Sequence, residues 1–332
     1  MNARRLLLAA AAICALWTMP VQAYLHLGFD TGAGTVRLHW VDSPVRWRAT
    51  ERGADHVTVA QFQDALARAF ATWQAVPTAS IAFQFGGFTA AEPFVDDGES
   101  VLGFQEEPDL DRVLGATTFI IDDETGEIVE ADVFFNSAFA WSTAPGGEAD
   151  RVDLESVALH EIGHFVGLGH SAIGETEPRP TGGRRVLGSG AVMFPIALAR
   201  GITSDRLLQP DDIAGVSVLY PDGTFTERTG VIRGRVRRGA GGVPGAHVVA
   251  FNPATGALVG GFALGDDGVF QIRGLSPGPH VIRAEPLDDA DVESFFSRAE
   301  VDVDFQVTFY DRLAVAPPGG AGPAFDVMVR PK

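Results

Sequence analysis

Residues 160–170 read His-Glu-Ile-Gly-His-Phe-Val-Gly-Leu-Gly-His and carry the side chains best suited to metal chemistry. Residues four apart on a helix lie on the same face, so His160 and His164 can hold one metal ion together. Gly167 can end that helix with a positive φ at no steric cost, which lets the chain turn back and present His170. Three imidazoles that leave a fourth position open for water are the arrangement of a catalytic zinc ion.

Glu161 follows the first of these histidines, and its carboxylate can reach a water molecule on the metal. Zinc lowers the pKa of such a water toward ~7 and polarises a carbonyl, so the pattern predicts metal-assisted hydrolysis of a peptide bond. Glu161 is then the general base that takes the proton of the water and passes it to the leaving amine. A lone pair of histidines on a helix is often only a solvated face, but here the acid, the spaced glycines and the third histidine coincide.

The elements around the motif are expected to position these groups. The helix that carries the motif should begin between Asp150 and Asp153, because acids suit the positive end of the helix dipole. The sequence Ala-Val-Met-Phe-Pro places Met193 in a candidate turn, as a floor beneath the imidazoles and not as a ligand. Residues 196–209 are expected to wall one side of the cleft, and Pro210 should begin a short closing helix.

The chain before the motif predicts one helix and several strands. A capping box at Thr58 and Gln61 begins a helix whose apolar side chains follow at helical spacing up to Trp73. Alternation predicts strands over residues 35–41, 81–85, 113–121 and 128–135, with a short apolar piece at 101–104. An extended peptide can add itself to an edge strand, and residues 114–117 are the candidates for that edge. The alternative is an interior strand that holds no ligand.

The composition suits a soluble protein of two domains. With 332 residues the chain exceeds one ordinary core, and its 46% of apolar residues can fill two. A formal charge of −18 argues against nucleic acid or an anionic membrane as a partner, and it fits bound cations such as calcium. We expect a monomer whose partner is a protein or peptide substrate.

Residues 1–23 are predicted to be a signal peptide, so the protein is expected to be secreted and extracellular, with the periplasm or the cell surface as alternatives. Arg4 and Arg5 supply the positive start, an apolar run follows, and Val-Gln-Ala ends at residue 23. The run is too short to span a bilayer comfortably; an uncleaved anchor is the alternative, and no stable membrane insertion is expected after cleavage. Cys14, the only cysteine, would leave with this segment, and the mature chain would have no disulfide.

Residues 152–220 resemble a matrixin, a member of the metzincin group that includes the matrix metalloproteases and their bacterial relatives. The resemblance rests on the zinc motif over 160–171, the methionine turn over 192–195 and the closing helix over 211–220, and weaker matches extend it to about 34–222. It implies an α+β, zincin-like catalytic domain with a five-stranded sheet, three helices and a horizontal cleft. The implied protein is a bacterial, secreted zinc endopeptidase that cleaves extracellular proteins. By the same resemblance, the substrate strand is lined by Leu114, Gly115 and Ala116.

The sequence departs from this family in three respects. Vertebrate members hold a second, structural zinc through histidines at positions that here read Ala116 or Thr117 and Phe134, so one zinc ion is expected. No cysteine remains for the family's propeptide latency device, so any latency must be controlled otherwise. The calcium ligands are only partly matched, and the candidates are Asp132 and Asn136, with Asp96 and Asp97. The alternative is that these side chains are simply solvated.

The composition changes near residue 225, where short β-branched runs divided by turn signals begin. Gly-x-Val, Val-Pro-Gly-Ala, Asp-Gly-x-Phe and Leu-x-Pro-Gly occur in this order and resemble the carboxypeptidase regulatory-like (transthyretin-like) domain. The spacing predicts a small antiparallel β-sandwich over 226–332, after a catalytic domain over 24–225. Residues 286–323 would be a long excursion before the last strand. Binding of matrix, glycan or substrate and simple stabilisation are all open as its role.

Two other functions stay open on the sequence alone. One is a secreted binding protein with an inactive zincin domain, in which the β-sandwich carries the function; a dead site would not need Glu161, however. The other is an exopeptidase, which would need a closed end of the cleft. Because every catalytic group precedes Tyr220, we expect residues 24–225 to fold and to cleave small peptides without the β-sandwich.

Overall fold

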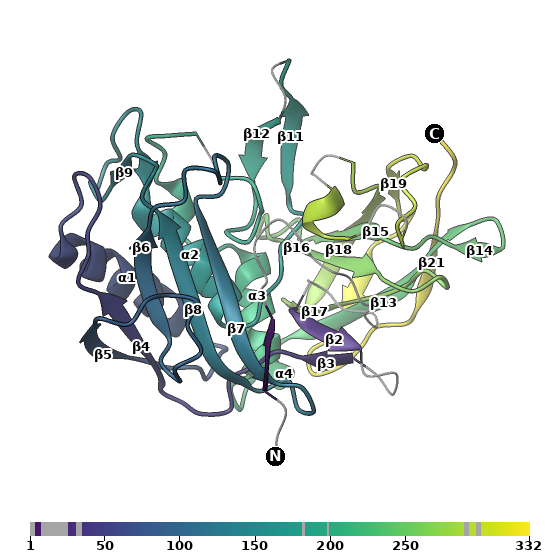
Figure 1. Cartoon of the computed structure of the whole chain (residues 1–332). Helices are drawn as coiled ribbons and strands as arrows, with labels where there is room; N and C mark the ends of the chain where they lie inside the picture. Colours follow the sequence, from purple (N-terminus) through teal and green to yellow (C-terminus); the bar gives the residue numbers. More distant parts are fainter. Residues whose placement is uncertain are drawn as a thin grey trace.

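The computed structural model describes residues 4–7, 26–30, 35–180, 183–197, 199–288, 292–296 and 300–332. Figure 1 shows these residues in two bodies, one before and one after about residue 230, that lie side by side. Of the predicted signal peptide, residues 1–3 and 8–23 lie outside the described residues. In the described part of the chain, no helix is long and apolar enough to cross a membrane.

The first body is built around a six-stranded sheet. Its strands lie in the order β1 (Arg4–Leu7), β7 (Gly115–Asp122), β8 (Ile128–Asn136), β6 (Val101–Gln105), β4 (Val45–Thr50) and β5 (Phe83–Thr89). β7 is antiparallel to both of its neighbours, and the other pairs are parallel. Five strands remain without β1, which falls within the predicted signal peptide.

The strand predicted over residues 35–41 is not part of this sheet. Only β3 (Thr35–Arg37) is regular there, and it pairs with β2 (Gly28–Asp30) in a separate two-stranded sheet. The strand that lies between β6 and β5 in the main sheet is β4. The sequence analysis did not predict this strand, although its Val45, Trp47 and Ala49 side chains are buried. Alternation indicates a half-buried extended chain but does not say which strand is its partner.

Shorter elements complete the first body. The helices are α1 (Val59–Gln74), α2 (Leu154–Phe165), α3 (Pro210–Leu219) and the four-residue α4 (Phe225–Arg228), with a 3-10 turn, η1, at Ser204–Arg206. Two small sheets pair β9 (Trp141–Ser142) with β10 (Val152–Asp153) and β11 (Gly174–Pro178) with β12 (Arg184–Ser189). The β11–β12 hairpin projects away from the body at the top of Figure 1.

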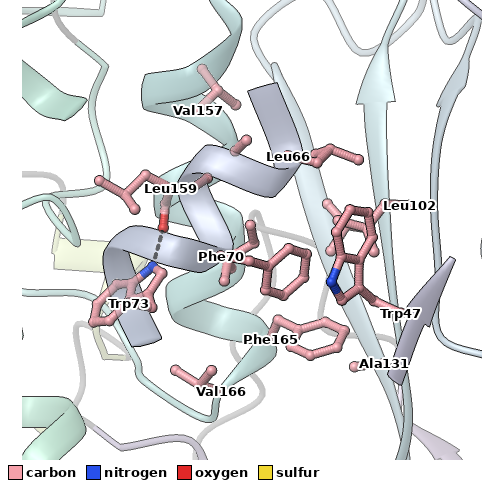
Figure 2. Packing of buried hydrophobic residues seen from close by; sticks show 14 of the residues in the cluster. Trp47, Leu66, Phe70, Trp73, Leu102, Ala131, Val157, Leu159, Phe165 and Val166 are labelled. Carbon is pink, nitrogen blue, oxygen red and sulfur yellow. Dashed lines mark hydrogen bonds between the residues drawn. The ribbon is translucent and has the colours of Figure 1, made fainter. Parts of the chain in front are cut away.

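α1 and α2 pack together against the sheet, and this packing fixes the helix that carries the metal motif (Figure 2). α1 begins at the predicted capping box, because Thr58 and Gln61 each bond to the other's backbone. Its apolar stripe is buried as predicted, at Phe62, Ala65, Leu66, Ala69, Phe70 and Trp73. The Trp73 indole N–H donates to the Leu159 carbonyl oxygen of α2 at 2.9 Å. Burial of one such side chain contributes about 1.5–3 kcal/mol, so α2 is held firmly.

The second body consists of two sheets over one apolar core. One sheet contains β14 (Gly241–Gly242), β13 (Gly230–Arg238), β17 (Val269–Leu275) and β21 (Phe325–Met328). The other contains β16 (Leu258–Ala263), β15 (Ala246–Phe251), β18 (Gly278–Glu285), β19 (Thr308–Phe309) and β20 (Ala314–Ala316). The sequence predicted an antiparallel arrangement throughout. This prediction was wrong at one pair, because β21 runs parallel to β13.

The predicted excursion over residues 286–323 is partly structured. It supplies β19 and β20, which both pair with β18, and a 3-10 turn, η2, at Val292–Ser294. The side chains of Phe295 and Phe296 are buried in an apolar cluster that also contains residues of the first body. This part of the second body therefore touches the first body close to the metal motif.

Candidate metal centre

α2 is positioned at both of its ends. Its N-cap is Asp153, which accepts a backbone N–H of the first turn and pairs with Arg206. The helix ends at Phe165, and Gly167 takes a φ of 95°, which turns the chain toward His170. A side chain at this glycine would also meet a backbone carbonyl oxygen at 2.4 Å. The predicted start and the predicted glycine exit are thus confirmed.

The three histidines of the motif converge on one point. Their ligand atoms all lie within 4.8 Å of one another, and the Nε2 atoms of His164 and His170 are 3.2 Å apart. Two nitrogens in a tetrahedral zinc site with Zn–N bonds of ~2.0–2.1 Å are separated by about 3.3 Å. Among the histidine, cysteine, aspartate and glutamate side chains of the described residues, these three histidines form the group that could hold a metal ion.

Hydrogen bonds fix the tautomer of each ring. The Nδ1 atoms of His160, His164 and His170 lie 2.7, 2.8 and 2.9 Å from the backbone carbonyl oxygens of Val192, Leu168 and Ser294. A carbonyl oxygen only accepts, so each Nδ1 carries the proton and each Nε2 presents a lone pair. Three lone pairs that face one another repel unless a cation lies between them. The donor set therefore fits a zinc ion.

Burial keeps these imidazoles neutral. It lowers the pKa of His160 and His164 and brings the pKa of His170 to about 3, with the neighbouring rings adding to the shift in His164 and His170. Metal ligation needs neutral imidazole, so the environment favours the form that binds.

Glu161 is buried beside the trio and is held from β7. The Thr117 hydroxyl donates to Glu161 Oε2 at 2.9 Å, and a Cβ at Gly115 would lie only 3.3 Å from Oε1. Burial raises the pKa of Glu161 to about 7, although the Thr117 hydrogen bond acts in the opposite direction. A fixed carboxyl group of this basicity suits proton transfer near neutral pH.

Met193 packs against the helix that carries the motif, and its role as the floor of the site stays a prediction. It is buried, and a Cβ at Gly163 of α2 would lie 2.1 Å from its sulfur and 2.9 Å from the Trp73 ring. The Met193 carbonyl oxygen accepts the Ser171 N–H at 2.8 Å, which ties the turn to the residue after the third histidine.

Gly163→Ala should destabilise the chain, because the new methyl group has no room between Met193 and Trp73. Overpacking of this kind costs about 1–3 kcal/mol, whereas alanine in a helix interior normally gains about 1 kcal/mol over glycine. Urea unfolding checks this, with Gly188→Ala as the control because a Cβ there meets nothing within 4 Å. Equal midpoints for the two variants would contradict the close packing.

Two adjacent acids at the start of α3 connect the site to its surroundings in different ways. Asp212 accepts the N–H groups of Val192 at 2.9 Å and Met193 at 3.1 Å, so it holds the methionine turn. Asp211 accepts the Ser171 hydroxyl at 2.6 Å and the Gly260 N–H of β16 at 2.7 Å. Both are buried, which raises the pKa of Asp211 to about 7 and that of Asp212 to about 6.

The variants Asp211→Asn and Asp212→Asn should differ sharply in stability. Both Asp212 oxygens accept backbone N–H groups, so an amide would turn a donor toward a donor and cost about 2–3 kcal/mol. An amide at Asp211 can still accept from Gly260 and donate to the rotatable Ser171 hydroxyl, so any loss of stability should stay below about 1 kcal/mol. Denaturant unfolding at pH 8 compares them, and an equal loss in both would refute this reading.

The same pair predicts a pH dependence. The folded pKa of Asp211 lies above its ordinary value of 3.8, so its contribution to stability is fully present below pH ~4 and is lost as pH rises toward 7. Asn does not titrate, so Asp211→Asn should flatten the fall in unfolding free energy between pH 4 and 7. A fall as steep as that of the unchanged chain would show that another group is responsible.

The sequence over residues 39–177 matches the family model described as Matrixin. Residues 39–177 form a matrixin domain. The chain is 30% identical over 174 residues to metalloendoproteinase 1-MMP of Arabidopsis thaliana and 31% identical over 203 residues to metalloendoproteinase 1 of Glycine max. These matches cover 50% and 57% of this chain, but only 40% and 52% of those two relatives.

A cleft of about 560 Å³ is lined by His160 and His170 of the matrixin domain. Leu114 and Gly115 line it, Ala116 is buried and is not among its lining residues, and contact of the three with substrate stays a prediction. The part of β7 before Phe119 has β8 on one side and no described strand on the other. Residues 196–209 do wall one side, through Ile196, Ala197, Ala199, Arg200, Ile202 and Asp205.

The candidate calcium ligands of the matrixin domain are engaged in hydrogen bonds. The Asp132 oxygens accept the N–H groups of Phe94 at 2.6 Å and Val101 at 2.8 Å, and the Asn136 side chain bonds to the Glu107 backbone. The predicted partner Asp97 accepts the Glu99 N–H. The Asp132 bonds hold the loop before β6 to β8, and calcium at these side chains stays a prediction.

The sequence analysis did not predict two groups that orient the site, one side chain and one backbone carbonyl. Thr117, which holds Glu161, is two residues from Gly115 and so on the same face of β7; this period-two relation was the available signal. The Ser294 carbonyl, which holds His170, comes from the second body, and no local pattern indicates it.

Proposed function

We propose that this protein is a secreted, zinc-dependent endopeptidase that hydrolyses peptide bonds of extracellular proteins. The observation that carries the proposal is the convergence of three Nε2 lone pairs beside a buried, hydrogen-bonded carboxyl group at the bottom of an open cleft. Membership of residues 39–177 in the matrixins and the named metalloendoproteinase relatives support the same activity. The signal-like residues 1–23 support secretion.

In the proposed mechanism His160, His164 and His170 hold the zinc ion, with their Nδ1–H groups fixed by backbone carbonyls. Zinc, when bound, supplies Lewis acidity that polarises the scissile carbonyl and acidifies a water molecule. Glu161 accepts the proton of that water at its carboxylate and donates it to the leaving amine. Thr117 keeps the carboxylate in place throughout.

The substrate is proposed to lie extended along the start of β7. Gly115 and the residues up to Thr118 leave one edge without a described partner strand, and backbone groups there can pair with a peptide. Leu114 and Gly115 line the cleft beside this edge. The two-sheet second body is proposed to be a β-sandwich of the carboxypeptidase regulatory-like type.

A peptide-library digest with zinc analysis of the same sample tests the function. Cleavage at interior bonds, dependent on bound zinc, is expected. Release of single residues from chain ends would instead identify an exopeptidase. A chain that holds zinc but cleaves no peptide would favour the binding protein with an inactive zincin domain.

A further inference from the structure

We infer that the second body is a working part of the metal centre, because it positions the third zinc ligand. The Nδ1–H groups of His160 and His164 donate to carbonyls of the first body. His170 is different: its Nδ1–H donates to the Ser294 carbonyl of η2, 124 residues further along the chain. The inference rests on the proposed zinc site, and it assigns a role to a body that carries no catalytic motif.

The segment around Ser294 is firmly anchored. Phe295 is only 3% exposed, and its ring lies edge-on to His170 with 6.0 Å between the ring centroids. It belongs to an apolar cluster that spans both bodies and consists of Ala172, Phe194, Phe262, Leu287, Phe295 and Phe296. Ala172 is two residues after His170, and Phe194 is next to Met193. The cluster thus binds η2 to the two stretches that form the site.

A second, independent attachment lies one residue beyond the ligand. Asp211 receives hydrogen bonds from Ser171 and from the Gly260 N–H of β16, so it bridges the two bodies. The contact is close, since a Cβ at Gly260 would lie 3.2 Å from Ile173. The second body therefore holds the ring of His170 through η2, and it reaches the side chain of the following residue, Ser171, through Asp211 and β16.

These contacts have a specific effect on the metal. A carbonyl that accepts Nδ1–H fixes the tautomer and the direction of the ring and raises the basicity of Nε2, and the loss of such a partner typically weakens metal binding ~10–100-fold. Glu293 and Ser294 also line the cleft, so the same segment contributes to its wall. The expectation that residues 24–225 work alone stays a prediction, and these contacts argue against it.

The test uses the full chain with Phe295→Ala, which removes the anchor of η2. The matched control is Phe309→Ala, on the same body but 60% exposed. Competition with a chromophoric chelator should show zinc bound ~10–100-fold more weakly by Phe295→Ala and unchanged in the control. The visible absorption of the cobalt(II)-substituted protein, which reports ligand geometry, should change in Phe295→Ala only. Equal zinc affinity and equal spectra in the two folded variants would overturn the inference.

A measurement on the unchanged chain covers the case in which Phe295→Ala fails to fold. Coupling between two sites is reciprocal, so zinc binding must protect η2 if η2 supports zinc binding. The Phe295 and Phe296 amides both donate to the Val292 carbonyl at 2.9 Å and report on this turn. The hydrogen-exchange rates of these two amides should fall when zinc is added. Equal rates with and without zinc would overturn the inference. Neither readout needs a peptide substrate, so a chain that binds zinc without cleaving peptides would remove the proposed function only.

Discussion

Glu161→Gln should lower peptide hydrolysis by at least ~10²–10⁴-fold while zinc content and fold are retained, because it removes the general base and nothing else. Gln has nearly the shape of Glu, and its amide oxygen can accept the Thr117 hydroxyl that now bonds Glu161 Oε2. Since Glu161 is buried, a neutral amide there carries no desolvation penalty for charge. Initial rates on a peptide substrate, zinc analysis and thermal unfolding check the three parts of this expectation.

The matched control for this variant is Glu155→Gln, on the same helix. Glu155 pairs with Arg68 at 2.7 Å and does not line the cleft, so its loss should affect stability slightly and leave the rate unchanged. Peptidase activity of Glu161→Gln close to that of the unchanged chain would contradict the role of this carboxylate.

Removal of the metal should abolish activity, and one equivalent of zinc should restore it. We expect one tightly bound zinc per chain, because structural zinc needs about four histidine or cysteine ligands and the described residues bring together only one trio. His164→Ala should take the zinc content close to zero. The positions expected to correspond to the second zinc site of vertebrate matrixins are Ala116 or Thr117 and Phe134, and all three side chains are buried.

Elemental analysis after dialysis measures this stoichiometry, with His39→Ala as the control because His39 is not part of the trio. The control should keep one equivalent. A second equivalent that survives His164→Ala would show that another site exists. Thermal unfolding adds an independent readout, since a ligand present at 1,000 times its Kd stabilises the folded state by about 4 kcal/mol.

The parts of the structure that the sequence predicted well are those that depend on near neighbours. His160 and His164 share a face because they are four residues apart on one helix. Gly167, just after the end of that helix, turns the chain with a positive φ. The Thr58 capping box and Pro210 mark helix starts for equally local reasons. In each case the physical cause lies within a few residues, so a pattern in the sequence is enough to find it.

The parts that were missed depend on partners distant in the sequence. β4 alternates apolar and polar side chains much as residues 35–41 do, and only pairing with β5 and β6 places it in the sheet. Thr117 meets Glu161 because β7 crosses α2 at that point. The parallel pairing of β21 with β13 likewise joins the two ends of the second body. Such pairings are set by the three-dimensional packing as a whole, which no short window of sequence contains.

The bond between His170 and Ser294 also bears on the timing of synthesis. Their 124-residue separation means that a chain made from its N-terminus forward displays the whole zinc motif long before it contains the carbonyl that orients the third ligand. A nascent chain can fold its first body in that interval, but Ser294 can orient His170 only after η2 has been made and has docked. The order of the two bodies along the chain thus delays the orientation of the third histidine until η2 has been synthesised.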